Sequence, residues 1–314
     1  MNNSYKPEGQ LSPKGDSPYA PPFKNIIPLQ EAMACGRILE ARATVCTSAR
    51  DLLVDLGFCR GIIPHDKGAL GIADGSTRDI AIISKVNKPV CFKVLSIEND
   101  SSGNLRPVLS RCAAQQECMD NYVSYLTPGD IIDVQVTHLE NFGCFVDIGC
   151  GIPSLIPIDN ISVSRISHPH DRFYPGQSIK AVVRSVENGR ITLSHKELLG
   201  TWEENAALFC SGETVAGIIR SVESYGIFVE LTPNLTGLAE PKSGVYPGQQ
   251  ASVYIKNLLP DKMKVKLIIV DAFDAAYQLP EPKYFLSSGH LDSFTYSPAC
   301  AYRKIETIFS PPDE

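Results

Sequence analysis

The sequence predicts a mainly β protein, built of tandem five-stranded barrels that short helices connect. Three observations predict this class. A pattern of residues recurs along the chain, apolar and polar residues alternate within each copy, and segments rich in Ala, Leu, Glu and Gln separate the copies. With 314 residues, 43% of them hydrophobic, the chain is long enough for two or three modest domains.

The first segment, residues 1–30, does not follow this pattern. It contains six prolines with Gly, Ser and Asn between them, so no periodic apolar face can form. This composition is typical of disordered segments. We therefore predict a disordered, proline-rich tail over residues 1–30.

An internal repeat is clearest between residues 141–148, NFGCFVDI, and residues 224–231, SYGIFVEL, which are 83 positions apart. A second match, the motif PGQ, recurs at 175–177 and 247–249 with a spacing of 72 positions. The later copy therefore lacks eleven residues of one loop. Ordered matches with one deletion indicate a duplicated domain.

A third, weaker copy lies upstream. LVDLG at 53–57 resembles FVDIG at 145–149, and VLS at 108–110 resembles TLS at 192–194. The sequence thus predicts three repeats, the first of them degenerate, at residues 31–115, 127–197 and 211–272.

Each repeat is predicted to form a set of short strands. Ile132, Val134 and Val136 alternate with polar residues, which is the period of a half-buried strand. Asn188-Gly189 joins two further strands and is a strong hairpin signal. Five short strands in one repeat favour a small closed barrel, for which the OB-fold is the commonest choice.

The segments outside the repeats complete the plan. Residues 116–126 and 198–210 carry no proline and are rich in helix-forming residues, so we predict helical linkers there. Residues 273–314, rich in Tyr, Phe, Ser and Pro, form a C-terminal extension for which the sequence predicts no fold.

The strand alternation places aromatic rings on the outward face. In the strand at 144–148, Phe145 and Asp147 point outward because successive side chains face opposite sides of a sheet. The strand at 227–231 repeats this arrangement with Phe228 and Glu230. We therefore predict that each ring shares the solvent face with a carboxylate.

A second ring precedes each of these strands, Phe142 in one copy and Tyr225 in the other. Exposed aromatic pairs on a barrel strand form stacking platforms for the bases of a single-stranded nucleic acid. An alternative stays open: the rings pack under the loop after the third strand or against the neighbouring repeat. The first repeat has Leu53 at the equivalent position, so we predict that it keeps the fold without the platform.

These motifs resemble the S-one repeat, the OB-fold RNA-binding domain named after the largest protein of the bacterial small ribosomal subunit. The resemblance is carried by PGD at 128–130, NFGCFVDIG at 141–149, RISHP at 165–169, PGQ at 175–177 and GRITLS at 189–194. It implies RNA contacts at Phe142, Phe145 and Arg190.

The match to this family has one departure. A histidine often follows the third strand in the family, whereas Pro157 stands there in this chain. His168, in the loop above the same face, is expected to compensate in part. In the last repeat GRITLS is absent, and Lys264 stands where Arg190 stands in the middle repeat.

Charge placement supports this interpretation. The balance of 29 Lys and Arg against 35 Asp and Glu gives a net charge of -6, which excludes a uniformly basic coat. Within residues 127–200, however, all the Lys and Arg residues lie in the second half, and residues 241–267 carry five lysines against Asp261 alone. The predicted RNA-binding residues are Phe142, Phe145, His168, Arg172, Lys180, Arg190, Tyr225, Phe228, Lys256 and Lys264.

The sequence carries no motif that is typical of an enzyme, a metal-binding protein or a membrane protein. There is no nucleophile motif, phosphate-binding glycine loop, metal-ligand spacing or C-x-x-C, so we predict no catalytic residue, no metal and no cofactor. The sequence shows no signal peptide and no apolar run long enough to span a membrane, which predicts a cytoplasmic protein without membrane partners.

The sequence therefore predicts a non-enzymatic protein whose last two repeats bind single-stranded RNA through stacking and phosphate contacts. The resemblance implies a role in translation, with mRNA and the small ribosomal subunit as partners and the first repeat in a structural or protein-binding role. Two alternatives remain: a non-ribosomal regulator of RNA stability or stress, and a protein-interaction adapter. RNA affinity that falls steeply with salt separates the adapter from the others.

Overall fold

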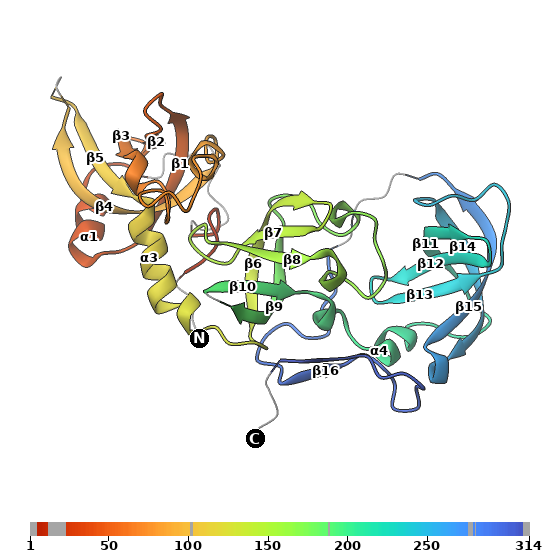
Figure 1. The fold of residues 1–314 in the computed structure, drawn as a ribbon. Coiled ribbons are helices and arrows are strands. Elements are labelled where there is room, and N and C mark those ends of the chain that lie inside the picture. Colours follow the sequence, from red (N-terminus) through yellow and green to blue (C-terminus); the bar gives the residue numbers. More distant parts are fainter. Residues whose placement is uncertain are drawn as a thin grey trace. The chain divides into compact units, whose positions relative to one another are not determined.

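The computed structural model describes residues 5–11, 23–100, 103–187, 189–275, 279 and 281–309 (Figure 1). It contains three closed five-stranded barrels, which confirms the mainly β fold class and the three tandem repeats. The chain divides into two compact units, one of residues 1–126 with 147–153 and one of residues 127–146 with 154–314. Half of the predicted tail, residues 1–4 and 12–22, lies outside the described residues.

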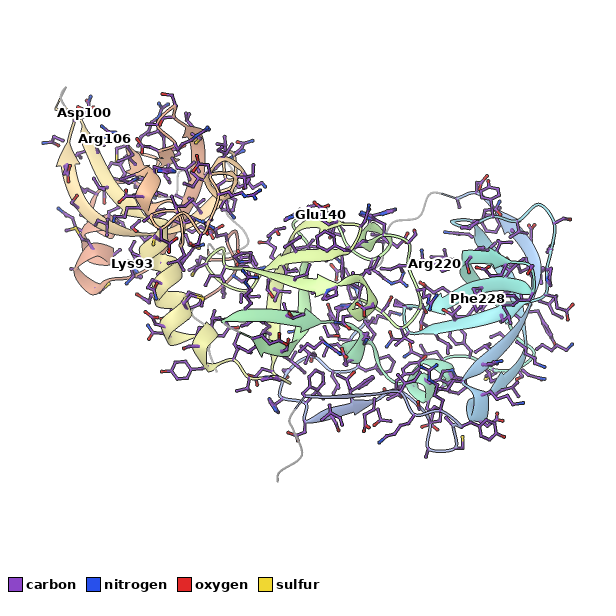
Figure 2. All side chains as sticks on the ribbon, in the orientation of Figure 1. Lys93, Asp100, Arg106, Glu140, Arg220 and Phe228 are labelled. Carbon is purple, nitrogen blue, oxygen red and sulfur yellow. The ribbon has the colours of Figure 1, made fainter. Side chains whose placement is uncertain are left out.

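The first barrel has the strand order β1-β2-β3-β5-β4. Its strands are β1 (Leu39–Cys46), β2 (Leu52–Asp55), β3 (Arg60–Ile63), β4 (Pro89–Asn99) and β5 (Leu105–Ser110). Helix α1 (Ile27–Cys35) precedes the barrel, η1 (His65–Lys67) and α2 (Ile80–Ile83) lie between β3 and β4, and α3 (Arg111–Asn121) and η2 (Val123–Tyr125) follow β5. The β4–β5 hairpin is long, with Asp100 and Arg106 near its tip (Figure 2).

The second barrel closes in the order β10-β8-β7-β6-β9. Its strands are β6 (Ile131–Glu140), β7 (Gly143–Asp147), β8 (Pro153–Pro157), β9 (Ser178–Glu187) and β10 (Arg190–Ser194), with η3 (Ile158–Asn160) and η4 (Pro169–Asp171) in the long loop after β8. β9 and β10 form the predicted antiparallel hairpin, although Asn188 itself lies outside the described residues. The predicted inward residues Val134 and Val146 are fully buried.

The third barrel repeats this topology as β11-β12-β13-β15-β14. Its strands are β11 (Thr214–Glu223), β12 (Gly226–Thr232), β13 (Leu235–Ala239), β14 (Gln250–Leu259) and β15 (Lys264–Phe273), and η6 (Pro260–Lys262) joins the last two. β13 and β15 run parallel, as β8 and β10 do in the second barrel. Both copies therefore close through the same parallel strand pair.

Short helices connect the barrels, as the sequence predicts. α3 starts at Arg111 because the side chain of Ser110 caps it, accepting a hydrogen bond from the N–H of Ala113 at 3.0 Å. After the second barrel, η5 (Lys196–Leu199) precedes α4 (Trp202–Ala206), whose capping box joins Thr201 and Glu204.

The C-terminal extension packs on the second unit. Strands β16 (Ser293–Thr295) and β17 (Glu306–Ile308) form a two-stranded sheet. Phe294, Tyr296 and Phe309 are buried in one apolar cluster with Trp202 of α4 and the interior of the third barrel. The aromatic composition of this segment therefore serves core packing.

Segment 5–11 differs from the predicted disordered tail. Glu8 is buried in the first unit, where its carboxylate forms ion pairs with Arg111 at 2.6 Å and Lys85 at 2.7 Å. These two cations lower the pKa of Glu8 to about 2 although its burial opposes ionisation. The N–H of Glu8 also donates to a carboxylate oxygen of Asp147 at 2.8 Å.

The buried imidazole of His195 makes the second unit sensitive to acid. Burial lowers the pKa of His195 to about 4, and its Nδ1 lies 2.9 Å from the carbonyl oxygen of Ile161. Because the folded pKa lies below the unfolded value, stability is complete above about pH 6.5 and falls as the pH drops toward 4.

We expect the free energy of unfolding of this unit to fall by ~3 kcal/mol between about pH 7.5 and pH 4.5, measured by urea denaturation. His195→Gln should remove most of this pH dependence. The matched control, His170→Gln, changes an exposed imidazole and should keep it. An unaltered pH profile in His195→Gln would contradict this assignment.

Candidate nucleic-acid interface

The second barrel carries a cluster of aromatic rings on its outward face. Phe145 lies on β7, and Phe142, in the preceding turn, is 56% exposed. Their ring centroids are 5.9 Å apart at an interplanar angle of 86°, so the rings meet edge to face. The predicted pair therefore exists as a surface feature and not as part of the barrel core.

A third ring joins this pair. His138, exposed on β6, stacks on Phe145 with centroids 4.4 Å apart and an interplanar angle of 8°. The sequence analysis did not include His138 among the site residues, because strict alternation from Val136 would point residue 138 inward. In the third barrel the equivalent Ser221 follows a register shift that begins at Ile219, and such a bulge turns the next side chain outward.

The third barrel repeats the pair of rings. Tyr225 is 66% exposed, and its centroid lies 6.1 Å from that of Phe228 at an interplanar angle of 87°. Ser221 lies opposite Phe228 on β11, so this copy has no third ring. Figure 2 shows Phe228 on the third barrel, together with Arg220 of the neighbouring strand.

A glycine fixes the turn before each of these strands. A Cβ atom on Gly143 would lie 2.5 Å from the carbonyl oxygen of Ile156, and one on Gly226 would lie 2.7 Å from that of Ala239. No side chain fits at such distances, so the backbone of the facing strand approaches closely only at glycine. This explains why the aromatic–glycine motif recurs in both copies.

The carboxylates next to the rings are buried, which corrects the prediction of a shared solvent face. Asp147 is buried in the first unit and accepts hydrogen bonds from the N–H groups of Glu8, Gly149 and Gly151. Desolvation raises the pKa of Asp147 to about 7. In the second unit, Glu230 is buried between Arg172 and Arg220, the latter at 2.8 Å.

Arg172 does not lie on the RNA face that the sequence analysis predicted for it. Its guanidinium is buried against Glu230, and Arg220 also pairs with Asp171 at 3.2 Å. The four side chains connect the loop around η4 to strands β11 and β12 of the third barrel. Arg172 is thus placed to hold this loop and is not available to a phosphate.

The other cations occupy different positions relative to the rings. Arg190 is exposed at the start of β10, and Lys264 is exposed at the equivalent start of β15. In the third barrel, Leu238 pairs with Phe228 on one side and with Lys266 on the other, two residues from Lys264. Lys264 therefore shares the outward surface with the rings.

Lys180 and His168 are less closely tied to the rings. Lys180 pairs with Asp133 at 2.7 Å, which is five positions along β6 from His138. Five strand residues correspond to about 16 Å. His168 is half-buried, and its Nδ1 accepts a hydrogen bond from the N–H of His170. Lys256 is exposed on β14.

Comparison with known proteins agrees with this geometry. The family model described as the S1 RNA binding domain matches residues 125–196, which include the second barrel and its rings. Curated relatives match over most of the chain as well. The small ribosomal subunit protein bS1 of Staphylococcus aureus (strain COL) is 30% identical over 259 residues, which cover 77% of this chain and 63% of that protein. The chain belongs to the S1-domain family.

Two further proteins are similar to this chain. The bS1 protein of Staphylococcus epidermidis is also 30% identical with the same coverage, so the chain spans less than two thirds of the length of these relatives. A solved Streptococcus pneumoniae multidomain protein with nucleic acid binding domains covers 74% of this chain and 73% of its own at 13% identity and a TM-score of 0.25.

Two further features of this S1-domain protein concern other ligands. In the described part of the chain, no helix has both the length and the apolar character to cross a membrane. Within residues 5–309, leaving out the undescribed positions, no cluster of three or more His, Cys, Asp or Glu side chains is arranged to hold a metal ion.

The buried position of Arg172 leads to a stability prediction. Arg172→Met should lower the free energy of unfolding of the second unit by ~3 kcal/mol, because it removes one partner of a buried ion pair. Arg165→Met, which changes an exposed arginine of the same loop, should change it by no more than ~0.5 kcal/mol. Chemical denaturation measures both. A folded, fully stable Arg172→Met with weakened RNA binding would instead restore Arg172 to the RNA surface.

Proposed function

We propose that this protein binds single-stranded RNA with its second and third barrels. One observation carries the proposal: the same edge-to-face pair occurs in two copies of the domain, with a half-buried Phe on the strand and an exposed ring in the turn before it. The degenerate first barrel has Leu53 there, half-buried on β2. Rings that served only the fold would also be needed in the first copy.

The chemistry of the rings favours binding with little sequence preference. Every base has a π-face, so stacking on Phe145 or Phe228 is open to any nucleotide of a single strand. In the second barrel the parallel rings of His138 and Phe145 enlarge the platform. We therefore assign the larger share of stacking to the second barrel.

Electrostatics supports the same proposal. Arg190, Lys256 and Lys264 supply exposed positive charge on strands of the two ring-bearing barrels. Glu230 lies two positions after Phe228 on β12 and forms buried ion pairs with Arg172 and Arg220. Because its charge is neutralised by these arginines, it repels a phosphate less than an unpaired carboxylate would. Affinity from such cations falls as salt increases, because binding releases counterions from the RNA.

The biological setting follows from the relatives, whose names place them in the small ribosomal subunit. We propose that this chain acts as a non-enzymatic partner or component of that subunit in translation, where it holds mRNA. The first barrel, which lacks the rings, is assigned to structure or to protein contacts.

Replacing the stacking rings tests the RNA site. Phe145→Ala and Phe228→Ala should each weaken binding of a single-stranded RNA oligomer by about 5- to 150-fold, since a stacked base contributes ~1–3 kcal/mol. The loss should be larger for Phe145→Ala, which also removes the support of His138. The slope of affinity against salt should stay unchanged, as measured by fluorescence anisotropy.

Two exposed tyrosines away from the rings provide the control. Tyr125→Ala and Tyr302→Ala should keep the affinity of the unaltered chain. If the ring variants fold and bind RNA as tightly as these controls, the rings serve a protein partner and the stacking model is wrong.

Association with the ribosome is tested separately. The full chain should co-sediment with small ribosomal subunits at low salt, and the Phe145→Ala, Phe228→Ala double variant should keep part of this association if the first barrel contacts protein. Strong RNA binding without co-sedimentation would favour a regulator that acts away from the ribosome.

A further inference from the structure

One outward face of the third barrel is apolar and exposed. On strands β14 and β15, Tyr254, Ile268, Val270 and Phe273 are 38%, 42%, 56% and 43% exposed. Tyr254 lies directly opposite Ile268 in the antiparallel register, so the two side chains share the centre of this surface. We call these four residues and their neighbours on the two strands the β14–β15 face.

The first barrel shows what normally covers this position. Lys93 on β4 and Ser110 on β5 pair as Tyr254 and Ile268 do. There, Ser110 is buried because it caps α3, and Lys93 forms an ion pair with Glu117 of the same helix. Figure 2 labels Lys93 beside α3. The helix that follows the last strand therefore covers the face.

The second barrel covers the equivalent face in the same way. Val182 on β9 and Ser194 on β10 are opposite each other, and both are fully buried. The hydroxyl of Ser194 bonds to Glu197 of η5, and Val182 belongs to the apolar cluster of Leu198 and Trp202. In two copies, a serine starts the helical segment that closes over the strands.

The third barrel lacks this device. Ile268 replaces the serine, and β15 continues to Phe273 over 10 residues, compared with 6 for β5 and 5 for β10. The β-branched residues Ile268, Ile269 and Val270 favour strand over helix. Among the described residues, no helix follows β15, and the face stays exposed.

Charges of opposite sign flank the centre of this face, one on each side. On one side, Lys266 lies opposite Asn257, which is three positions from Tyr254 along β14. On the other side, Asp271 lies opposite Ser252, which is two positions from Tyr254. These offsets correspond to about 7–10 Å along the strands. Within the described part of the chain, neither Lys266 nor Asp271 forms an ion pair.

We propose that the β14–β15 face is a homodimer interface, occupied by a second copy of this chain. A two-fold axis through the Tyr254–Ile268 pair places the apolar centres against each other. The same axis brings Lys266 of each copy to Asp271 of the other, so one rotation satisfies both charges twice. A partner unrelated to this chain would not need a positive charge on one side of the apolar centre and a negative charge on the other.

The size of the face sets the strength of the dimer. Strands about 4.8 Å apart and some six residues long present only a few hundred Å² per copy, less than the ~800 Å² per partner of a standard interface. The dimer is therefore weak, and it forms in a concentration-dependent manner. The stacking ring Phe228 lies on β12 and not on this face, so the oligomeric state tests this inference separately from the proposed RNA binding.

Charge reversal tests the interface through the oligomeric state. For the full chain, sedimentation equilibrium should show a monomer–dimer equilibrium. Lys266→Asp and Asp271→Lys should each raise the dimer dissociation constant at least about tenfold, the effect of ~1.4 kcal/mol. Both changes together should restore it to near the value of the unaltered chain, because the swapped charges meet again across the axis.

Two further variants complete the experiment. Ile268→Asp should abolish the dimer, whereas Lys262→Asp, which reverses a neighbouring exposed lysine outside the face, should leave it intact. Circular dichroism checks that each variant is folded. A chain that is monomeric at every concentration overturns the proposal, as does a dimer that ignores the charge reversals. A monomer whose RNA affinity drops in Tyr254→Ala would assign the face to RNA instead.

Discussion

Closure of each five-stranded sheet is the constraint on which the rest of this structure depends. A closed barrel has no free edge, and small apolar side chains on alternate positions fill its interior. The three interiors are accordingly alike, with Val54, Val146 and Val229 fully buried at equivalent positions of the second strand of each barrel. The copies differ in the outward-facing side chains of the same strands. These side chains can change without loss of the fold. One row carries the stacking rings, and another receives a covering helix or stays exposed.

Buried ion pairs set how these outward rows are used. A carboxylate lies two positions after the Phe of each ring pair. Backbone N–H groups bind the carboxylate of Asp147, and Arg172 and Arg220 bind that of Glu230. Asp147 holds segment 5–11 and the turn after β7, whereas Glu230 holds the loop around η4, and both leave the adjacent ring half-buried at the surface. Such pairs are weak evidence for stability on their own, yet the loss of one partner leaves an uncompensated charge. The ring platforms thus rest on polar contacts as much as on the apolar core.

Much of the fold could be predicted because its signals are local. Alternation and the recurring aromatic–glycine turn gave the barrels and placed Phe145 and Phe228 outward, as the structure has them. The errors concern partners that lie far apart in the chain. Arg172 pairs with Glu230, 58 positions later, and no local pattern reveals such a contact. His138 was not predicted because β6 departs from strict alternation there, with Thr137 and His138 both exposed. The place of segment 5–11 could not be predicted because it depends on the buried ion pair of Glu8 with Arg111, 103 positions later.

The placement of segment 5–11 has a consequence for the order in which the chain matures. Glu8 is synthesised before its partner Arg111, which follows 103 positions later. The N–H of Glu8 then needs the carboxylate of Asp147, which lies 139 positions downstream. Domains generally fold as units during synthesis, from the N-terminal end. The first barrel can close on its own strands, but the N-terminal segment reaches its final place only after β7 of the next barrel has been made. Segment 5–11 is therefore among the last parts of the first unit to settle.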